Sequence, residues 1–141
     1  MSFDSQGRRF VCSNSRHVVW VAYERSDVIP NPFFDPPSAL TDIADDGAAA
    51  PVYRISPDEP WRVVRTRWRV SGVVRGMIEG GGRVSGYFTS ATGIHMYWGD
   101  AYGESFRDNI FVGDVGSNLV HRKILVSKSG SIQPCLLYTS D

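Results

Sequence analysis

The side chains of this chain best suited to move protons near neutral pH are its histidines, and His17 has the most polar neighbours in sequence. It ends a polar stretch in which Asn14 and Arg16 precede it. An imidazole has a pKa close to working pH, so it can serve as a general base. Two interpretations are open: His17 takes a proton from a substrate, or it hydrogen bonds within a loop and holds a turn in place.

A second histidine, His121, lies beside Arg122 in the run 119–124. Side chains alternate along a strand, so Leu119, His121 and Lys123 are expected on one face and Arg122 on the other. The polar face would line a channel, or it would tie neighbouring strands together through water and Asp114.

Small hydroxyl side chains gather at Thr89, Ser90 and Thr92, ahead of Gly93. Such a stretch lets a backbone approach a ligand closely, and it is equally typical of a tightly packed inner strand. It is not a phosphate loop, because the lysine and the following helix are missing.

Two acids, Asp100 and Asp114, each follow a glycine. This position suits a carboxylate that caps its own turn. A calcium ion would need six to eight oxygen ligands, and no acid-dense loop supplies them. The sequence therefore predicts no metal site.

Three arginines, Arg65, Arg67 and Arg69, alternate with other residues in the run 65–70. We expect a strand there, with the three guanidinium groups on one face. They would bind an anionic ligand, or they would pair with the acidic stretch that precedes them.

These residues must be positioned by short strands, because the chain shows no long helical period. The stretch 26–60 differs from the rest of the chain, because it carries seven acids, one arginine and seven prolines. We expect it to be an irregular excursion with one short strand at 51–57. One helical turn is expected at 104–109. The pattern favours an all-β, antiparallel fold. Strands are predicted at 9–12, 18–23, 51–57, 65–70, 94–98, 110–112 and 119–127, with a hairpin loop at 13–17.

Composition excludes several classes of protein. The 141 residues allow one domain, and fifteen basic residues balance fifteen acidic ones. A net charge of zero argues against a nucleic-acid partner, which requires a cationic surface. No apolar run is long enough to span a membrane, and no signal peptide is visible. Cys12 and Cys135 cannot build a disulfide framework.

The last seven residues, 135–141, read like a translation of the transposase-end sequence used in sequencing libraries. We therefore expect them to be a tail derived from a sequencing adapter, and the alternative is an ordinary C-terminal strand. The expectation is that the chain is an internal segment of a longer protein.

Three segments carry a resemblance to a known family, namely residues 2–14, 52–67 and 88–122. They resemble the β-propeller module of the membrane-bound dehydrogenase-like, haem-binding proteins of the planctomycete and verrucomicrobial group, which are similar to glucose/sorbosone dehydrogenase propellers. The resemblance implies that residues 1–134 are an incomplete β-propeller, with about two to three blades of six. It also implies an extracytoplasmic location, with the remaining blades and a cytochrome-c-like domain in the same chain.

The resemblance further implies oxidation of an alcohol or sugar, with electrons passed to a quinone or haem. His17 would be the catalytic base. Haem c, or pyrroloquinoline quinone with calcium, would be the cofactor of the full-length protein. Covalent haem is not expected in this segment, because Cys12 is not followed by a second cysteine and a histidine. Cofactor contacts are expected from Asn14, Arg16, Thr89, Ser90, Thr92, His121 and Arg122.

An alternative is that the propeller only binds, as a scaffold for carbohydrate or protein attached to a separate cytochrome domain. Exposed aromatic side chains would then stack on sugar rings. The candidates are Trp20, Trp61, Tyr97, Trp98 and Tyr102. In either case, the segment alone is expected to be inactive as an enzyme, because half of a propeller's axial site would be missing.

Overall fold

The computed structural model describes residues 1–128 and 131–136 of the chain. Strands dominate, and the few helices are short, so the predicted all-β class is confirmed. The strands form two four-stranded antiparallel sheets, each in simple sequence order. In the part of the chain that is described, no helix has the length and apolar character needed to cross a membrane.

The first sheet is built from the N-terminal third of the chain. Its strands are β1 (Ser2–Phe3), β2 (Arg9–Val11), β3 (Val19–Val21) and β4 (Leu40–Asp42). The predicted hairpin is confirmed, because β2 pairs with β3 in a register that sets Phe10 opposite Trp20. The loop that joins them carries His17.

The second sheet is longer and holds the C-terminal half. Its strands are β5 (Ala91–Met96), β6 (Asn109–Asp114), β7 (Leu119–Lys128) and β8 (Ser131–Leu136). Strand β5 shifts register against β6 between Thr92 and His95, and Gly93 in this bulge has a φ of 60°, which favours glycine. The predicted alternation is correct for Ile94 and Met96, which are buried, but Trp98 lies beyond the strand and is half exposed.

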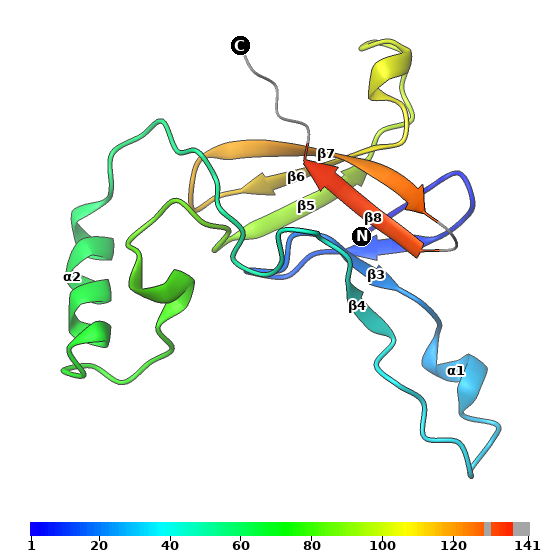
Figure 1. The fold of residues 1–141 in the computed structure, drawn as a ribbon, viewed down its shortest axis with the longest axis horizontal. Coiled ribbons are helices and arrows are strands. Elements are labelled where there is room, and N and C mark those ends of the chain that lie inside the picture. Colours follow the sequence, from blue (N-terminus) through cyan, green and yellow to red (C-terminus); the bar gives the residue numbers. More distant parts are fainter. Residues whose placement is uncertain (129–130, 137–141) are drawn as a thin grey trace.

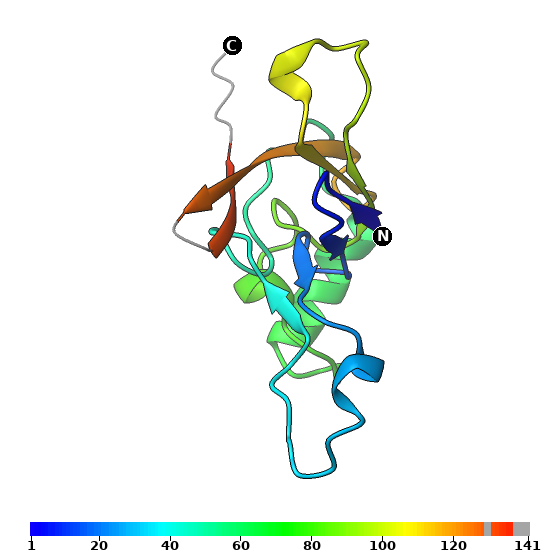
Figure 2. The same ribbon diagram turned by 90° about the vertical axis from the view of Figure 1, so that its right-hand side faces the viewer.

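The two sheets lie one above the other and share one hydrophobic core (Figures 1 and 2). Phe10 of the first sheet and Val18, just before β3, contribute from one side, and Met96, Ile110 and Val112 contribute from the second sheet. Strand β1 also lies against β5, since the Met96 N–H donates to the Ser2 hydroxyl oxygen at 2.8 Å. Burial of apolar side chains between the layers is therefore what joins the two halves of the chain.

The predicted arginine strand is wrong. Residues Pro60–Val70 form a helix, α2, which stands apart from both sheets (Figure 1). Pro60 begins the helix at a position where its missing N–H costs nothing, and arginine is a good helix former. The helical period turns Arg65 and Arg69 toward Glu79 and leaves Arg67 exposed, so the three arginines do not share a face.

The stretch 26–60 contains the short helix α1 (Arg25–Val28, which begins just before it) and strand β4. The predicted strand at 51–57 is wrong, since only Pro51 forms a bridge, to Tyr87. The prolines that flank this run leave too few backbone donors for a ladder.

Two 3₁₀ turns complete the fold: η1 (Glu79–Gly82) follows α2, and η2 (Glu104–Phe106) is the helical turn predicted at 104–109. Of the expected tail 135–141, residues 137–141 lie outside the described residues.

Candidate functional site

His17, the predicted base, is completely buried. Its ring stacks on Phe88, with 4.3 Å between the centroids and an interplanar angle of 5°. Its Nε2 lies 3.2 Å from Asp46 Oδ1, an ion-pair distance without hydrogen-bond geometry. The loop between β2 and β3 thus turns this side chain into the space between the sheets rather than toward solvent.

Lys123 of β7 is another buried ionisable group, with 1% of its residue surface exposed. Its Nζ lies 2.5 Å from Asp46 Oδ1 and 3.3 Å from Asp45 Oδ1. Burial by itself raises the pKa of Asp46, but the neighbouring His17 and Lys123 outweigh it and hold that pKa well below its ordinary range. We call His17, Asp46 and Lys123 the buried charge cluster, and the exposed Asp45 lies at its edge.

His121 sits at the edge of this cluster, with its ring edge-on to Phe88 and to His17 at centroid distances of 5.3 Å and 6.1 Å. Burial, followed by the positive charge of Lys123, lowers the pKa of His121 to about 4. At neutral pH the ring is therefore uncharged. The sequence pattern correctly placed His121 and Lys123 on one face, but it missed Asp45 and Asp46.

The remaining predicted cofactor residues do not join His17 in one site. The backbone carbonyl of Asn14 accepts from the Ala91 N–H at 2.9 Å, and Arg16 lies 3.5 Å from an Asp42 carboxylate oxygen. Arg122 donates to Asn109 Oδ1 at 3.0 Å and covers the Phe106 ring at 3.7 Å. These contacts are structural ties within and between neighbouring elements.

The hydroxyl-rich stretch also makes structural contacts. Thr89 is buried and its hydroxyl lies 3.4 Å from a Glu79 oxygen, while the Ser90 N–H donates to Asp114 Oδ1 at 2.8 Å. Thr92 is exposed. Among the described residues, no group of three metal-ligating side chains is arranged to hold an ion.

A different set of side chains, on the loop between β5 and β6, faces solvent. This segment, residues 97–108, is called the aromatic loop, and it projects beyond the second sheet (Figure 1, yellow). Trp98 is 50% exposed and Tyr102 is 65% exposed. Tyr97 packs on Tyr102 at 5.4 Å, and on Phe111 of β6 at 6.1 Å. The ring cluster anchors the loop on the sheet.

The aromatic loop borders an open hollow of about 300 Å³ lined by Tyr97, Trp98, Arg107 and Asp108. The Trp98 indole N–H donates to the Phe3 carbonyl at 3.1 Å, which fixes the ring. Aromatic faces, a guanidinium and a carboxylate thus meet at one hollow. Such a hollow suits a ligand whose ring has an apolar face, which stacks on the aromatic side chains, and polar groups at its edge, which form hydrogen bonds.

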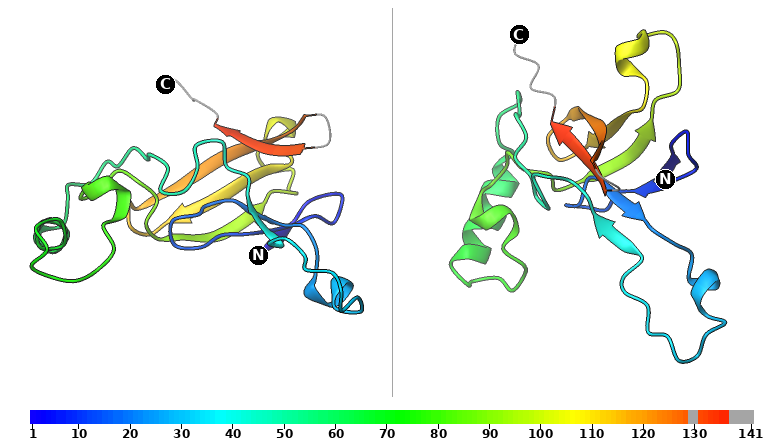
Figure 3. Two further views of the ribbon diagram at one scale, coloured as in Figure 1. Left: turned by 60° about the horizontal axis from the view of Figure 1, so that its bottom comes forward. Right: turned by 45° about the vertical axis from the view of Figure 1, so that its right-hand side comes forward.

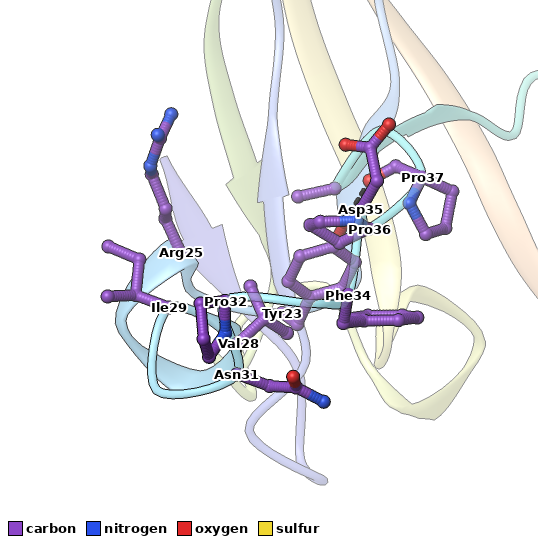
Figure 4. Close-up of a pocket in the computed structure, with 11 residues that line it drawn as sticks. Tyr23, Arg25, Val28, Ile29, Asn31, Pro32, Phe34, Asp35, Pro36 and Pro37 are labelled. Atoms are coloured by element: carbon purple, nitrogen blue, oxygen red, sulfur yellow. Dashed lines mark hydrogen bonds between the residues drawn. The ribbon is translucent and has the colours of Figure 1, made fainter.

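A second hollow, of about 470 Å³, lies in the excursion after β3, and Figure 4 shows its lining. It is formed mainly by proline, aromatic and aliphatic side chains from residues 23–39, which we call the arm. The Tyr23 hydroxyl donates to the Pro37 carbonyl and closes the arm on itself. Among the residues that line this hollow, Asp35 is the one with a carboxylate.

Comparison with known proteins places the chain in a family but not in a functional class. No curated protein matches it, and no solved structure matches it. The family model described as "Domain of unknown function (DUF7133)" matches residues 1–135, so the chain belongs to this family.

Proposed function

We propose that this chain is a segment of a β-propeller that binds carbohydrate and acts as a scaffold within a larger protein. Two four-stranded sheets in simple antiparallel order, packed face to face, are what two neighbouring propeller blades would require. Exposed apolar residues on strands of both sheets, such as Phe3, Leu40 and Val120, would then meet the next blades.

The observation that carries the binding function is the hollow of the aromatic loop. A sugar ring has apolar C–H faces that stack on an indole, and its hydroxyl groups would accept from Arg107 and donate to Asp108. Arg107 lies 3.2 Å from Asp100 and 3.5 Å from Glu104, so its guanidinium is already oriented by two exposed carboxylates. A preoriented polar group loses less entropy when a ligand binds.

The oxidoreductase expectation needs a base that touches its substrate. His17 has no exposed surface and stacks on Phe88. Neither hollow described above is lined by a residue that we expected to hold haem or quinone. The geometry therefore supports binding better than catalysis by this segment.

Titration with soluble oligosaccharides tests the proposal. A panel of neutral oligosaccharides and an oligomer of uronic acids would be followed by intrinsic tryptophan fluorescence and by calorimetry. Trp98→Ala is expected to weaken binding by about tenfold or more, because it removes the stacking platform. Trp61→Ala is the matched control, since Trp61 is a half-exposed indole outside the loop.

The result that contradicts the proposal is equal binding by the wild-type chain and Trp98→Ala, or no binding to any member of the panel. Dye-linked oxidation of a sugar that is lost in His17→Ala would instead support the oxidoreductase function. The two outcomes are separable, because one measures affinity and the other measures turnover.

A further inference from the structure

Helix α2 presents its apolar side chains outward, which is the reverse of an ordinary surface helix. Trp61, Val64 and Trp68 recur at the spacing of one helix face, and they are 54%, 41% and 51% exposed. Val74, which follows the helix, is also exposed, and its N–H donates to the Trp68 carbonyl at 3.2 Å. An exposed apolar face of this kind indicates an interaction surface.

The arginines explain why the helix is oriented this way. Arg62 is buried and lies 3.0 Å from Glu59, while Arg65 and Arg69 lie 3.9 Å and 3.7 Å from Glu79. Ion pairs therefore hold the basic face against the segments that directly precede and follow the helix. The tryptophan face is left outward as a consequence.

The two tryptophans of this face differ in whether arginine side chains cover their rings. Arg62 and Arg65 both lie over the Trp61 ring, at 5.0 Å and 4.8 Å from its centroid, and they hold it. Within the described residues, no arginine covers the Trp68 ring in this way. Arg67, its exposed neighbour, forms no ion pair there either. Trp68 and Arg67 thus form a protruding apolar group beside a positive charge.

The arm offers the complementary shape and charge. Its hollow is lined by apolar groups such as Val28, Pro32 and Phe34, and at about 470 Å³ it is large enough for an indole ring (Figure 4). Asp35 stands at its edge, exposed and without an ion-pair partner among the described residues. Phe33, 96% exposed, extends the apolar surface.

The two elements also differ in net charge, since residues 60–83 contain six arginines and one glutamate, whereas the arm contains three acids and one arginine. Within each copy, Arg62, Arg65, Arg69 and Glu24 already form ion pairs, so Arg67 and Asp35 are the charges that we assign to the contact. The two elements lie at opposite ends of the molecule, as Figures 1 and 3 show, and neither covers the other.

We propose that the arm binds helix α2 of a second copy of this chain. Trp68 of one copy enters the arm hollow of the other, and Arg67 faces Asp35. Each copy offers one helix face and one arm, so two copies that lie antiparallel about a two-fold axis would form both contacts at once and close the pair. Buried tryptophan and arginine side chains are the groups that most often dominate the affinity of an interface.

Sedimentation velocity over a range of protein concentrations tests the proposal. The wild-type chain should associate reversibly, and Trp68→Ala should weaken association about tenfold or more. Tyr53→Ala, which removes an exposed aromatic ring elsewhere, should leave it unchanged. Arg75→Glu is the matched comparison for charge, because Arg75 is an exposed arginine of the same basic segment outside the helix, and it should weaken association less than Arg67→Glu does.

Charge reversal gives a readout that does not depend on removing a side chain. Arg67→Glu and Asp35→Lys should each weaken association alone. An equimolar mixture of the two variants should restore it, since the introduced carboxylate of one variant then meets the introduced ammonium group of the other, and the second contact keeps the original Arg67 and Asp35. A wild-type chain that remains monomeric would overturn the proposal. So would association that all these variants share equally, because it would then come from pairing of open sheet edges.

Discussion

At the residue scale, Lys123 shows how a charged side chain is tolerated in the interior. Its ammonium group is almost fully buried, and Asp45 and Asp46 supply the compensating carboxylates from a loop far away in sequence. A buried charge that loses its partner keeps its desolvation penalty, so removal of one partner is more damaging than removal of both.

Lys123→Met is expected to lower the free energy of unfolding by roughly 3 kcal/mol, because it leaves the largely buried Asp46 carboxylate without its ammonium partner. Urea denaturation followed by tryptophan fluorescence measures the change. The double variant with Asp46→Leu should recover part of the loss. If Lys123→Met alone were neutral, the buried charge cluster would contribute nothing to stability.

His121 makes stability depend on pH. Its pKa in the folded protein is about 4, below the ordinary value of 6.5, so the unfolded chain binds more protons between these two values. Stability should therefore rise with pH from about 4 to 6.5, and fall on acidification through the same window. His121→Gln should remove part of that slope, roughly 1–2 kcal/mol after a discount for the ring's partial exposure.

Thermal or urea unfolding at several pH values checks this expectation. Asp46 has a lowered folded pKa, so its contribution is present above the ordinary aspartate pKa and is lost only at more acidic pH. His121 and Asp46 thus change the stability of the protein over different pH ranges. An unchanged slope in His121→Gln would contradict the assignment of the neutral ring.

At the element scale, helix α2 is held by groups at both of its flanks. Before the helix, Glu59 accepts hydrogen bonds from the Arg54 guanidinium, which lowers the pKa of Glu59 to about 2, and it also pairs with Arg62. After the helix, η1 supplies Glu79 to the arginines. The position of η1 depends on Gly80, whose φ is 52° and whose Cα faces the Tyr87 ring.

Gly80→Ala is expected to destabilise this turn by about 2–3 kcal/mol, because a Cβ combines a strained backbone with overpacking. The added atom would lie 2.5 Å from the Tyr87 ring, whereas at Gly81 a Cβ would meet nothing within 4 Å. Gly81→Ala, with a φ of 68°, is the matched control and should show the backbone cost alone, about 1 kcal/mol. Equal losses in denaturant unfolding would contradict contact with Tyr87.

At the scale of the whole molecule, the shared core predicts that the two sheets unfold together. Phe10 of β2 packs in the same cluster as Ile110 of β6. Phe10→Ala should cost about 3–5 kcal/mol and should reduce amide-exchange protection in β6 as well as in β3. Phe33→Ala, the same change at an exposed site, should stay within about 0.5 kcal/mol. Loss of protection confined to the first sheet would show that the sheets are independent.

Much of the strand content could be predicted, because strand periodicity is a local property. The hairpin around residues 13–17, the alternation of Ile94 and Met96, and the turn at 104–109 all followed from neighbouring residues. The strand predicted at 65–70 failed because the stretch 60–70 also carries apolar residues at helical spacing, Trp61, Val64 and Trp68, and Pro60 starts a helix there. The candidate site was harder to predict, because His17 lies in a polar stretch of the sequence but is buried in the folded structure.

What the amino-acid sequence determined by itself is the all-β class, the irregular stretch between β3 and α2, and the common face of His121 and Lys123. These depend on side-chain alternation, proline chemistry and turn residues, which act over a few positions. Only the tertiary structure decided that Asp46 meets Lys123, that Trp98 opens onto a hollow, and that Trp68 faces outward. Such contacts join residues distant in sequence, and they follow from how two sheets bury a common core rather than from any local pattern.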